Sequence, residues 1–467
     1  MSATSDMFAP PVNRAMKVLD RSFFQKTVPI SAARIFSPRD ISRCRKELES
    51  SKDLPSLNLS RAMLVRPDPD ATRAQSGGKC ILLKPEILHN DITTWSPGLR
   101  HLESSGALGV IPYSLSLDYS SYTYADIMNA IIEPSDEPDE LPTGFAQAGH
   151  VAHLNLRSKY LPHKHLIATV LADKNPHVRT VIHKLDDVGA ENAFRTFKYE
   201  VLHGPDDMAV TLNEQGCTFS FDFSRVYWNS RLHTEHERMA RGVFASGDAI
   251  CDVMAGIGPF AVPAGKKKCF VYANDLNPDS FRYLNDAIRI NKVGDYVRSF
   301  NDDGHAFIRT ATADLLQSRY KVDIMPKTKP PRNRSKSRAP VVAPLKTLVQ
   351  PRIFAHYVMN LPASAITFLP NFVGLYSNVP GVSRDEIREL LGKHGYPMIH
   401  VYCFSTKSDD NVAETKEICD EISRQLKCEI TPETPELVVY DVRDVAPKKR
   451  MFCASFRLPE EVAFREV

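Results

Sequence analysis

The chain has 467 residues, of which 43% are hydrophobic and 25% charged, the composition of a globular protein of two or three domains. A formal net charge of only +3 excludes a polycation, so any nucleic-acid surface must come from local basic patches. Nine cysteines without C-x-x-C spacing argue against structural zinc and a disulfide framework, and no apolar run is long enough to span a membrane.

We predict that residues 1–145 form one N-terminal domain. Their patterns are mixed and point to no particular chemistry. From Met7 to Arg39, six basic residues stand against one acid. This bias is compatible with a mitochondrial presequence and equally with a basic segment packed on the domain. The cysteine usage favours a reducing compartment. We expect the protein in the cytoplasm and nucleus, with a pool in the mitochondrial matrix.

Two stretches of biased composition are predicted to be linkers or insertions. Residues 133–142 hold five acids and three prolines and are expected to separate two modules. Residues 325–352 hold eight basic residues, six prolines and no acid. We predict that this second stretch is a disordered basic extension, which could add non-specific attraction to phosphates.

Residues 146–232 are predicted to form a small α+β module. Strand patterns occur at 149–156, 180–185 and 217–228. In the third of these, Phe219, Phe221 and Phe223 alternate with polar residues and should share one face.

Apolar strands alternate with helical stretches in residues 233–467. Strands are predicted at 249–255, 269–275, 296–302, 353–360 and 398–405, and helices at 278–292, 304–318, 362–372, 383–394 and 410–427. Near-continuous apolar strands separated by helices are typical of a parallel sheet covered on both faces. Two more strand-like runs flank Ala446 and Pro447 and predict an antiparallel hairpin. The predicted fold is α/β, a Rossmann-like domain with a mostly parallel seven-stranded sheet, preceded by smaller α+β modules.

A glycine-containing loop follows the first of these strands. Gly256 and Gly258 would allow a tight turn and a close approach of a ligand, but the third glycine of the dinucleotide fingerprint is missing. Asp252 lies near the carboxyl end of the same strand, where doubly wound sheets bind ligands. Asp275 ends the second strand, at the position from which a carboxylate can bridge ribose hydroxyls.

Further polar residues continue this edge of the sheet. Asn277 is predicted to cap a helix that begins at Pro278. Asp303 ends the third strand and could accept from an adenine amino group, and Gly304 beside it would leave room for the ring. Three acids at strand ends and a glycine loop indicate an adenosine-containing ligand, with simple caps and turns as the alternative. The missing third glycine favours S-adenosylmethionine over NAD.

The stretch HYVMNLPASA ends the fourth strand with an amide side chain. Asn360 could be a turn residue, a helix cap or a catalytic group. Its position on the fourth strand predicts that it faces the same crevice as the cofactor, where an amide can donate and accept at once. Pro362 is predicted to be the first residue of the following helix.

Two other features stay open on sequence grounds. Residues 230–240 are rich in histidine, arginine and glutamate, which by composition indicates a solvated helix start with i,i+3 pairs. Arg195 lies between two phenylalanines and could be structural or could contact a base or phosphate.

Five blocks together resemble one enzyme family, in the family's order: NSRLHTEHERM, CDVMAGIGPFAVPAGKK, VYANDLNPDSFRYLNDAIRINKV, HYVMNLPASAITFL and VRDVAPKKRMFCASFRLP. The family is the eukaryotic and archaeal tRNA (guanine-N1-)-methyltransferases, which act on guanine 37 beside the anticodon. The similarity runs from about Gly149 to Pro459, and the basic insertion before Asn360 departs from it.

The resemblance implies S-adenosylmethionine as the cofactor and tRNA with guanine 37 as the partner, and we expect a monomer with no obligate protein partner. It implies that Glu235 is the general base, that Arg195 contacts the target guanine and that Asn360 heads an N-x-P motif. The cofactor-contacting positions that it implies are His236, Asp275, Leu276, Asp303, Gly304 and Asn360. The domain before Glu133 and the module at 146–232 would hold the tRNA.

Three alternative functions fit these residues less well. Exocyclic-amine methyltransferases favour N-P-P followed by an aromatic residue, but Leu361 and Ala363 stand at the differing positions. A cytosine C5 enzyme would need a Pro-Cys nucleophile, which this region lacks. A non-catalytic tRNA-binding protein on a degenerate fold is disfavoured by the intact Glu235, Asp275 and Asn360.

Overall fold

The computed structural model describes residues 7–55, 64–133, 144–185, 194, 196–326 and 343–466. The chain divides into two compact units, which are described separately. Unit 1 comprises Met1–Phe145, His153–His183 and Val201–Pro205, and unit 2 comprises Ala146–Ala152, Lys184–Glu200 and Asp206–Val467. Segments of the predicted module 146–232 therefore fall in both units, and the three-part division stays a prediction.

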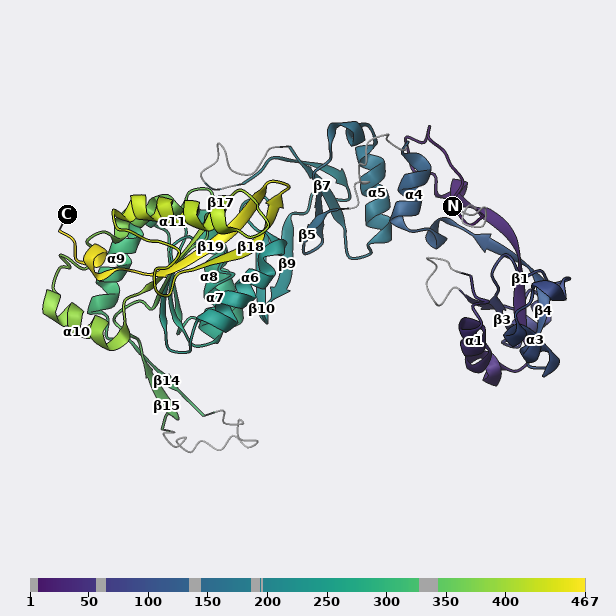
Figure 1. The fold of residues 1–467 in the computed structure, drawn as a ribbon, viewed down its shortest axis with the longest axis horizontal. Coiled ribbons are helices and arrows are strands. Elements are labelled where there is room, and N and C mark those ends of the chain that lie inside the picture. The colour runs from purple at the N-terminus through teal and green to yellow at the C-terminus, as the bar shows by residue number, and fades with distance from the viewer. Residues whose placement is uncertain are drawn as a thin grey trace, which may run out of the picture. The chain divides into compact units, whose positions relative to one another are not determined.

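Unit 1 contains an antiparallel sheet of order β2-β3-β1-β4 (Figure 1). The strands are β1 (Lys26–Ile35), β2 (Val65–Pro67), β3 (Lys79–Leu82) and β4 (Leu108–Leu117), and the helices are α1 (Ile41–Ser50), α2 (Ala71–Gln75), α3 (Pro97–Ser104), α4 (Tyr124–Ile131) and α5 (Lys164–Lys174). Apolar side chains of α1 and α3, among them Leu48 and Leu99, pack with Ala33 and Ile81 of the sheet. This core accounts for the stability of the sheet, because it covers one of its faces.

Six short strands follow in the chain: β5 (Ala146–Ala148), β6 (Val151–Leu154), β7 (Thr180–Lys184), β8 (Tyr199–His203), β9 (Ala209–Glu214) and β10 (Cys217–Asp222). The predicted strands at 149–156 and 180–185 are confirmed as β6 and β7. The third is shorter than predicted, because the Asp222 side chain accepts from the backbone N–H of Ser224 and turns the chain. Phe219, Phe221 and Phe223 are all buried, as their alternation predicted.

Unit 2 is built on the predicted seven-stranded sheet, of order β13-β12-β11-β16-β17-β19-β18. Its strands are β11 (Ala249–Asp252), β12 (Phe270–Asn274), β13 (Val297–Phe300), β16 (His356–Met359), β17 (Met398–Ser405), β18 (Val438–Ala446) and β19 (Lys449–Arg457). The first five run parallel, and β19 and β18 form the predicted antiparallel hairpin.

Helices cover this sheet (Figure 1). They are α6 (His233–Glu237), α7 (Ala261–Lys266), α8 (Pro278–Asn291), α9 (Gly304–Gln317), α10 (Arg384–His394), α11 (Val412–Leu426) and α12 (Glu460–Ala463). Four of the predicted helices are confirmed as α8, α9, α10 and α11, and α7 was not predicted. Apolar residues of α9, α10 and α11 form one continuous core with one face of the sheet. No helix of the described residues is long and apolar enough to cross a membrane.

Two predictions about the region before and after Asn360 are wrong. The helix predicted at 362–372 is a 3-10 helix, η9 (Ala365–Phe372), and Pro362 lies in the turn before it. The end of the predicted disordered extension forms β15 (Lys346–Val349), which pairs antiparallel with β14 (Lys321–Ile324). Backbone pairing and a Thr347–Asp323 hydrogen bond order this part despite its prolines. Residues 327–342, and residues 134–142 of the predicted linker 133–142, lie outside the described residues.

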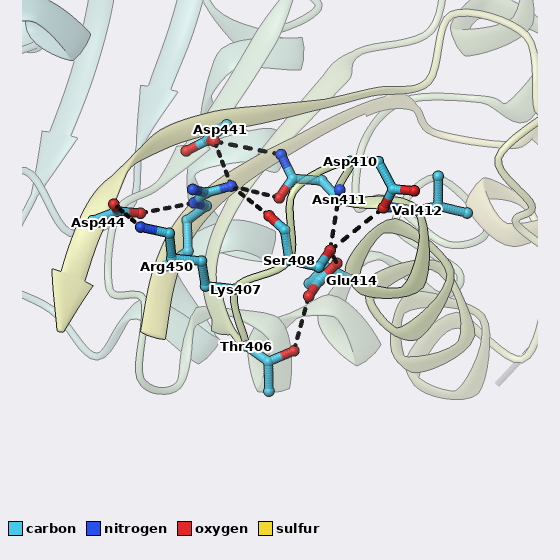
Figure 2. Close-up of polar contacts among 10 residues, drawn as sticks. All are labelled: Thr406, Lys407, Ser408, Asp410, Asn411, Val412, Glu414, Asp441, Asp444 and Arg450. Carbon is cyan, nitrogen blue, oxygen red and sulfur yellow. Dashed lines mark hydrogen bonds and ion pairs between the residues drawn. The ribbon is translucent and has the colours of Figure 1, made fainter. Parts of the chain in front are cut away.

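The loop between β17 and α11 is held by a polar network, which Figure 2 shows. Arg450 at the start of β19 donates to Asp444 at 2.8 Å and to the side chain of Asn411 at 2.7 Å. The buried carboxylate of Glu414 accepts from the hydroxyls of Thr406 and Ser408, and the Ser408 hydrogen bond lowers its pKa. These contacts fix the loop at the carboxyl end of β17, the same edge of the sheet at which β11, β12 and β16 end.

Candidate active site

A cavity of about 320 Å³ opens at the carboxyl ends of the parallel strands in unit 2. This is the edge at which parallel α/β sheets bind ligands, and the volume falls in the range of small-molecule sites. Its walls are formed by Phe194, Tyr227, Trp228, Asn229, Leu232, His236, Val253, Met254, Ala255, Gly256, Ile257, Pro259, Phe260, Asn274, Asp275, Leu276, Asn277, Ser280, Asp303, Gly304, His305, Asn360, Leu361 and Phe368.

The glycine loop contributes to the wall through Gly256. Its φ of +57° favours glycine, and a Cβ built there would meet nothing within 4 Å, so the backbone is open to a ligand. Gly258 has a φ of +94°, and its Cβ would lie 2.7 Å from Leu284 and 2.9 Å from Val262. Gly258 does not line the cavity, and close packing against α8 explains why glycine stands there.

Two acids lie side by side at the ends of β11 and β12, and only one reaches the cavity. Asp275 lines it and accepts from the backbone N–H groups of Gly256 at 2.8 Å and Asn277 at 2.9 Å. Burial raises the pKa of Asp275, against the effect of these two hydrogen bonds. Asp252 is 1% exposed, and within the described residues neither of its carboxylate oxygens has a hydrogen-bond partner. Burial, and then the charge of Asp275, raises the pKa of Asp252 well above its usual range.

The adjoining wall comes from the turns after β12 and β13. Asn277 caps α8 by accepting from the N–H of Asp279, and Pro278 is the first residue of that helix, as predicted. Asp303 is exposed and caps α9. A Cβ at Gly304 would lie 3.0 Å from Phe368 and 3.1 Å from Val253, so the absent side chain also serves packing. Leu276 is 51% exposed on the rim of the cavity.

Asn274 is a residue of the wall that the sequence analysis missed. Its buried amide donates to the carbonyls of Val253 and Asp302 and accepts from the Asp302 N–H. These three hydrogen bonds join the ends of β11, β12 and β13, and they therefore shape the edge that carries Asp275. The only sequence signal was a polar residue at the end of an apolar strand.

Asn360 ends β16 and lines the cavity, as predicted. It is half-buried, and within the described part of the chain its side-chain amide forms no hydrogen bond. The carbonyl of Leu361 accepts from the N–H groups of Ser364 and Ala365, so a turn and not a helix start follows the strand. Because the amide caps no helix, its donors and its acceptor are free for a ligand.

The short helix α6 presents His236 and Glu235 in different directions. His236 lines the cavity, bonds through Nδ1 to the Glu214 carboxylate and meets the Phe260 ring edge-on at 4.9 Å. Glu235 is 2% exposed and does not line the cavity. The composition of 230–240 indicated a solvated segment, but these two side chains are buried.

Three hydrogen bonds hold the Glu235 carboxylate behind the cavity wall. Arg238 donates to both of its oxygens, at 2.7 and 2.6 Å, and the Tyr402 hydroxyl donates to Oε1 at 2.6 Å. Burial lowers the pKa of Arg238, and the hydrogen bond to Glu235 raises it. The net effect is a raised pKa. Tyr402 packs against Phe260 of the wall, with ring centroids 6.1 Å apart. Arg195 lies outside the described residues, so its predicted contact with guanine is not placed.

A seven-stranded sheet with five parallel strands, a closing antiparallel hairpin and a cavity at the carboxyl ends defines an α/β protein of the class I methyltransferase type. Residues 210–323 match the family model of the TRM5/TYW2 methyltransferase domain, and residues 124–207 match that of the TYW2 N-terminal domain. The chain belongs to the tRNA (guanine(37)-N(1))-methyltransferase family, because relatives of that name match it over nearly its whole length.

Two such relatives come from fungi. The protein of Phaeosphaeria nodorum is 63% identical over 99% of this chain and 100% of its own length, and that of Emericella nidulans is 49% identical over 99% and 96%. Among solved structures, Trm5b of Pyrococcus abyssi is 18% identical, covers 92% of this chain and 99% of its own, and has a TM-score of 0.55. At that identity the structural likeness shows the fold alone, and it agrees with the predicted fold class.

Proposed function

We propose that this protein transfers a methyl group from S-adenosylmethionine to nitrogen 1 of guanine 37 in tRNA. The observation that carries the proposal is the full-length similarity, at 63% identity, to a relative named for this reaction. The roles of single residues below are part of the proposal and rest on where their side chains lie.

The residues of the cavity fit S-adenosylmethionine. Each oxygen of Asp275 accepts one backbone hydrogen bond, and with the further contact from Ser280 the carboxylate still keeps a lone pair for a ribose hydroxyl. Gly256 leaves its backbone open, and Leu276 and Gly304 offer an apolar rim for a ring. His236 and Asn360 supply polar groups on the remaining wall. When bound, the cofactor supplies an activated methyl group on a sulfonium.

The reaction requires a base, because nitrogen 1 of guanine carries a proton and is a poor nucleophile while it does so. We assign this base to Glu235, which is the only predicted catalytic carboxylate. A positioned general base contributes about 10²–10⁴-fold. In this structure the carboxylate is bound by Arg238 and Tyr402, so accepting the guanine proton requires it to exchange part of this contact for the substrate.

Guanine must also be oriented and its developing charge stabilised. The free amide of Asn360 can accept from an N–H of the base and donate to a carbonyl oxygen. Negative charge grows on guanine O6 as the proton leaves, and a fixed cation such as Arg195 would stabilise it, by about 3 kcal/mol if it acts as other oxyanion donors do. The target base has to leave its stack in the anticodon loop to reach the cavity.

Methyl transfer to unmodified tRNA transcripts tests the proposal. With labelled S-adenosylmethionine, transcripts carrying guanine at position 37 should be labelled, those carrying adenine should not, and the nucleoside product should be 1-methylguanosine. A product methylated on the exocyclic amine would overturn it. Glu235→Gln should retain cofactor binding in calorimetry and lose most of the single-turnover rate, and a near wild-type rate in that variant refutes the base assignment.

We further propose that the protein acts as a monomer, that it divides between cytoplasm, nucleus and mitochondrial matrix, and that the predicted N-terminal domain and the module at 146–232 hold the tRNA. Sedimentation of the purified chain, fractionation of cells and binding of tRNA by a chain lacking the N-terminal domain test these points separately.

A further inference from the structure

A buried chain of polar side chains lies behind the proposed base, on the face of the sheet opposite the main apolar core of unit 2. Tyr402 on β17 and Cys453 on β19 are cross-strand partners, as are His400 and Ser455. Because side chains two residues apart on a strand share a face, these four form one polar patch. All four are at most 8% exposed.

Polar contacts connect Cys453, Ser455 and His400 of this patch. Ser455 Oγ lies 3.7 Å from Cys453 Sγ and 2.8 Å from His400 Nδ1. His400 Nε2 lies 3.0 Å from His356 Nδ1, and His356 Nε2 lies 3.4 Å from the Asp248 carboxylate. The series therefore leads from Asp248, before β11, to Cys453, the cross-strand partner of Tyr402.

The single hydroxyl proton of Tyr402 is donated to Glu235, so none is left for its cross-strand partner Cys453. In the contact between Cys453 and Ser455, either atom can be the donor. Burial, and then the charges of His356 and Arg238, hold the pKa of His400 well below its usual range. The ring is therefore neutral, so one of its nitrogens donates and the other accepts.

We propose that Tyr402 is a positioning residue for the general base: its buried hydroxyl, on the strand position opposite Cys453, holds the Glu235 carboxylate in place. This rests on the proposed function, because it presumes that Glu235 takes the guanine proton. The carboxylate is faced by Arg238 from its own helix turn, by Tyr402 from β17 and by Cys453 from β19, and the Arg238 guanidinium stacks on Tyr440 of β18.

Arg238 and Tyr402 have separable effects on the carboxylate. The guanidinium binds both oxygens and has to yield at least one of them to the substrate, whereas the tyrosine hydroxyl can remain on Oε1 throughout. A hydrogen bond to a charged group is worth about 1.5–3 kcal/mol, which corresponds to one or two pH units. Loss of the hydroxyl would remove this stabilisation of the carboxylate.

The test is the pH profile of the single-turnover methyl transfer rate for Tyr402→Phe. We expect the acid limb of this pH profile to move up by about one pH unit or more. At high pH the rate should reach a plateau within a few-fold of the wild-type rate. The matched control is Tyr357→Phe, which removes an equally buried hydroxyl, bonded to Thr312 at 2.6 Å, on the opposite face of the sheet. Its acid limb should stay in place.

A purely structural role would lower the melting temperature of both variants and move neither limb, and this result overturns the proposal. If Tyr402→Phe does not fold, Ser455→Ala removes the hydroxyl that contacts Cys453 and should move the limb in the same direction by less. An unmoved limb in that variant overturns the proposal equally. Glu235→Gln separates the two hypotheses. If that variant is active, the base assignment fails, but if it is inactive while the Tyr402→Phe limb is unmoved, only this inference fails.

Discussion

Replacing Gly258 by alanine should destabilise unit 2 through a clash that can be separated from backbone strain. The new Cβ would lie 2.7 Å from Leu284 and 2.9 Å from Val262, and a φ of +94° disfavours any side chain. Gly247 has a φ of +96°, but a Cβ there meets nothing within 4 Å. The left-handed conformation costs about 1–3 kcal/mol in both variants, and overpacking adds about 1–3 kcal/mol in Gly258→Ala alone.

Urea unfolding measures this difference if the signal reports unit 2. The chain has two tryptophans, Trp95 in unit 1 and Trp228 in unit 2. In a Trp95→Phe background, fluorescence therefore follows the environment of Trp228, which packs on Phe219 and Phe221. We expect Gly258→Ala to lose about 1–3 kcal/mol more free energy of unfolding than Gly247→Ala. Equal losses in the two variants would refute the packing argument for Gly258.

Two further predictions concern the cavity and the buried histidine. Asp275→Asn should weaken S-adenosylmethionine binding about 10–100-fold in calorimetry, because a charged acceptor is lost, and an unchanged dissociation constant would contradict its assignment. Since burial depresses the pKa of His400, below its usual 6.5 the unfolded chain binds a proton that the folded chain does not. The free energy of unfolding should therefore fall as pH drops from about 6.5 to 5, and less steeply in His400→Gln; identical slopes in urea titrations would show that another group is responsible.

The secondary structure of unit 2 was largely predictable, because its strands are short apolar runs bounded by capping and turn residues. Asn277, Pro278 and Asp303 mark helix starts by their local chemistry, which does not depend on the rest of the fold. The predictions failed where local signals were weak or conflicting. Pro362 suits a first helical residue, yet the chain turns there, and the prolines near Lys346 concealed the strand β15.

The sequence by itself determined which residues lie at the carboxyl edge of the sheet, since parallel strands bring their ends together whatever their order. His236, Asp275 and Asn360 were predicted on this edge or by family resemblance, and they share one cavity. Only the tertiary structure decided which side chains face that cavity. Asp252, the last residue of β11, and Gly258, in the loop after it, face the protein interior.

The surroundings of Glu235 were beyond sequence reasoning for a related reason. Its partner Tyr402 is 167 positions away, and it becomes a neighbour only because β17 lies in the sheet beneath α6. From sequence alone, a charged side chain at the start of a helix is predicted to be solvated, because most such side chains are. Whether it is instead buried and hydrogen-bonded depends on long-range packing, which brings together residues that carry no common pattern along the chain.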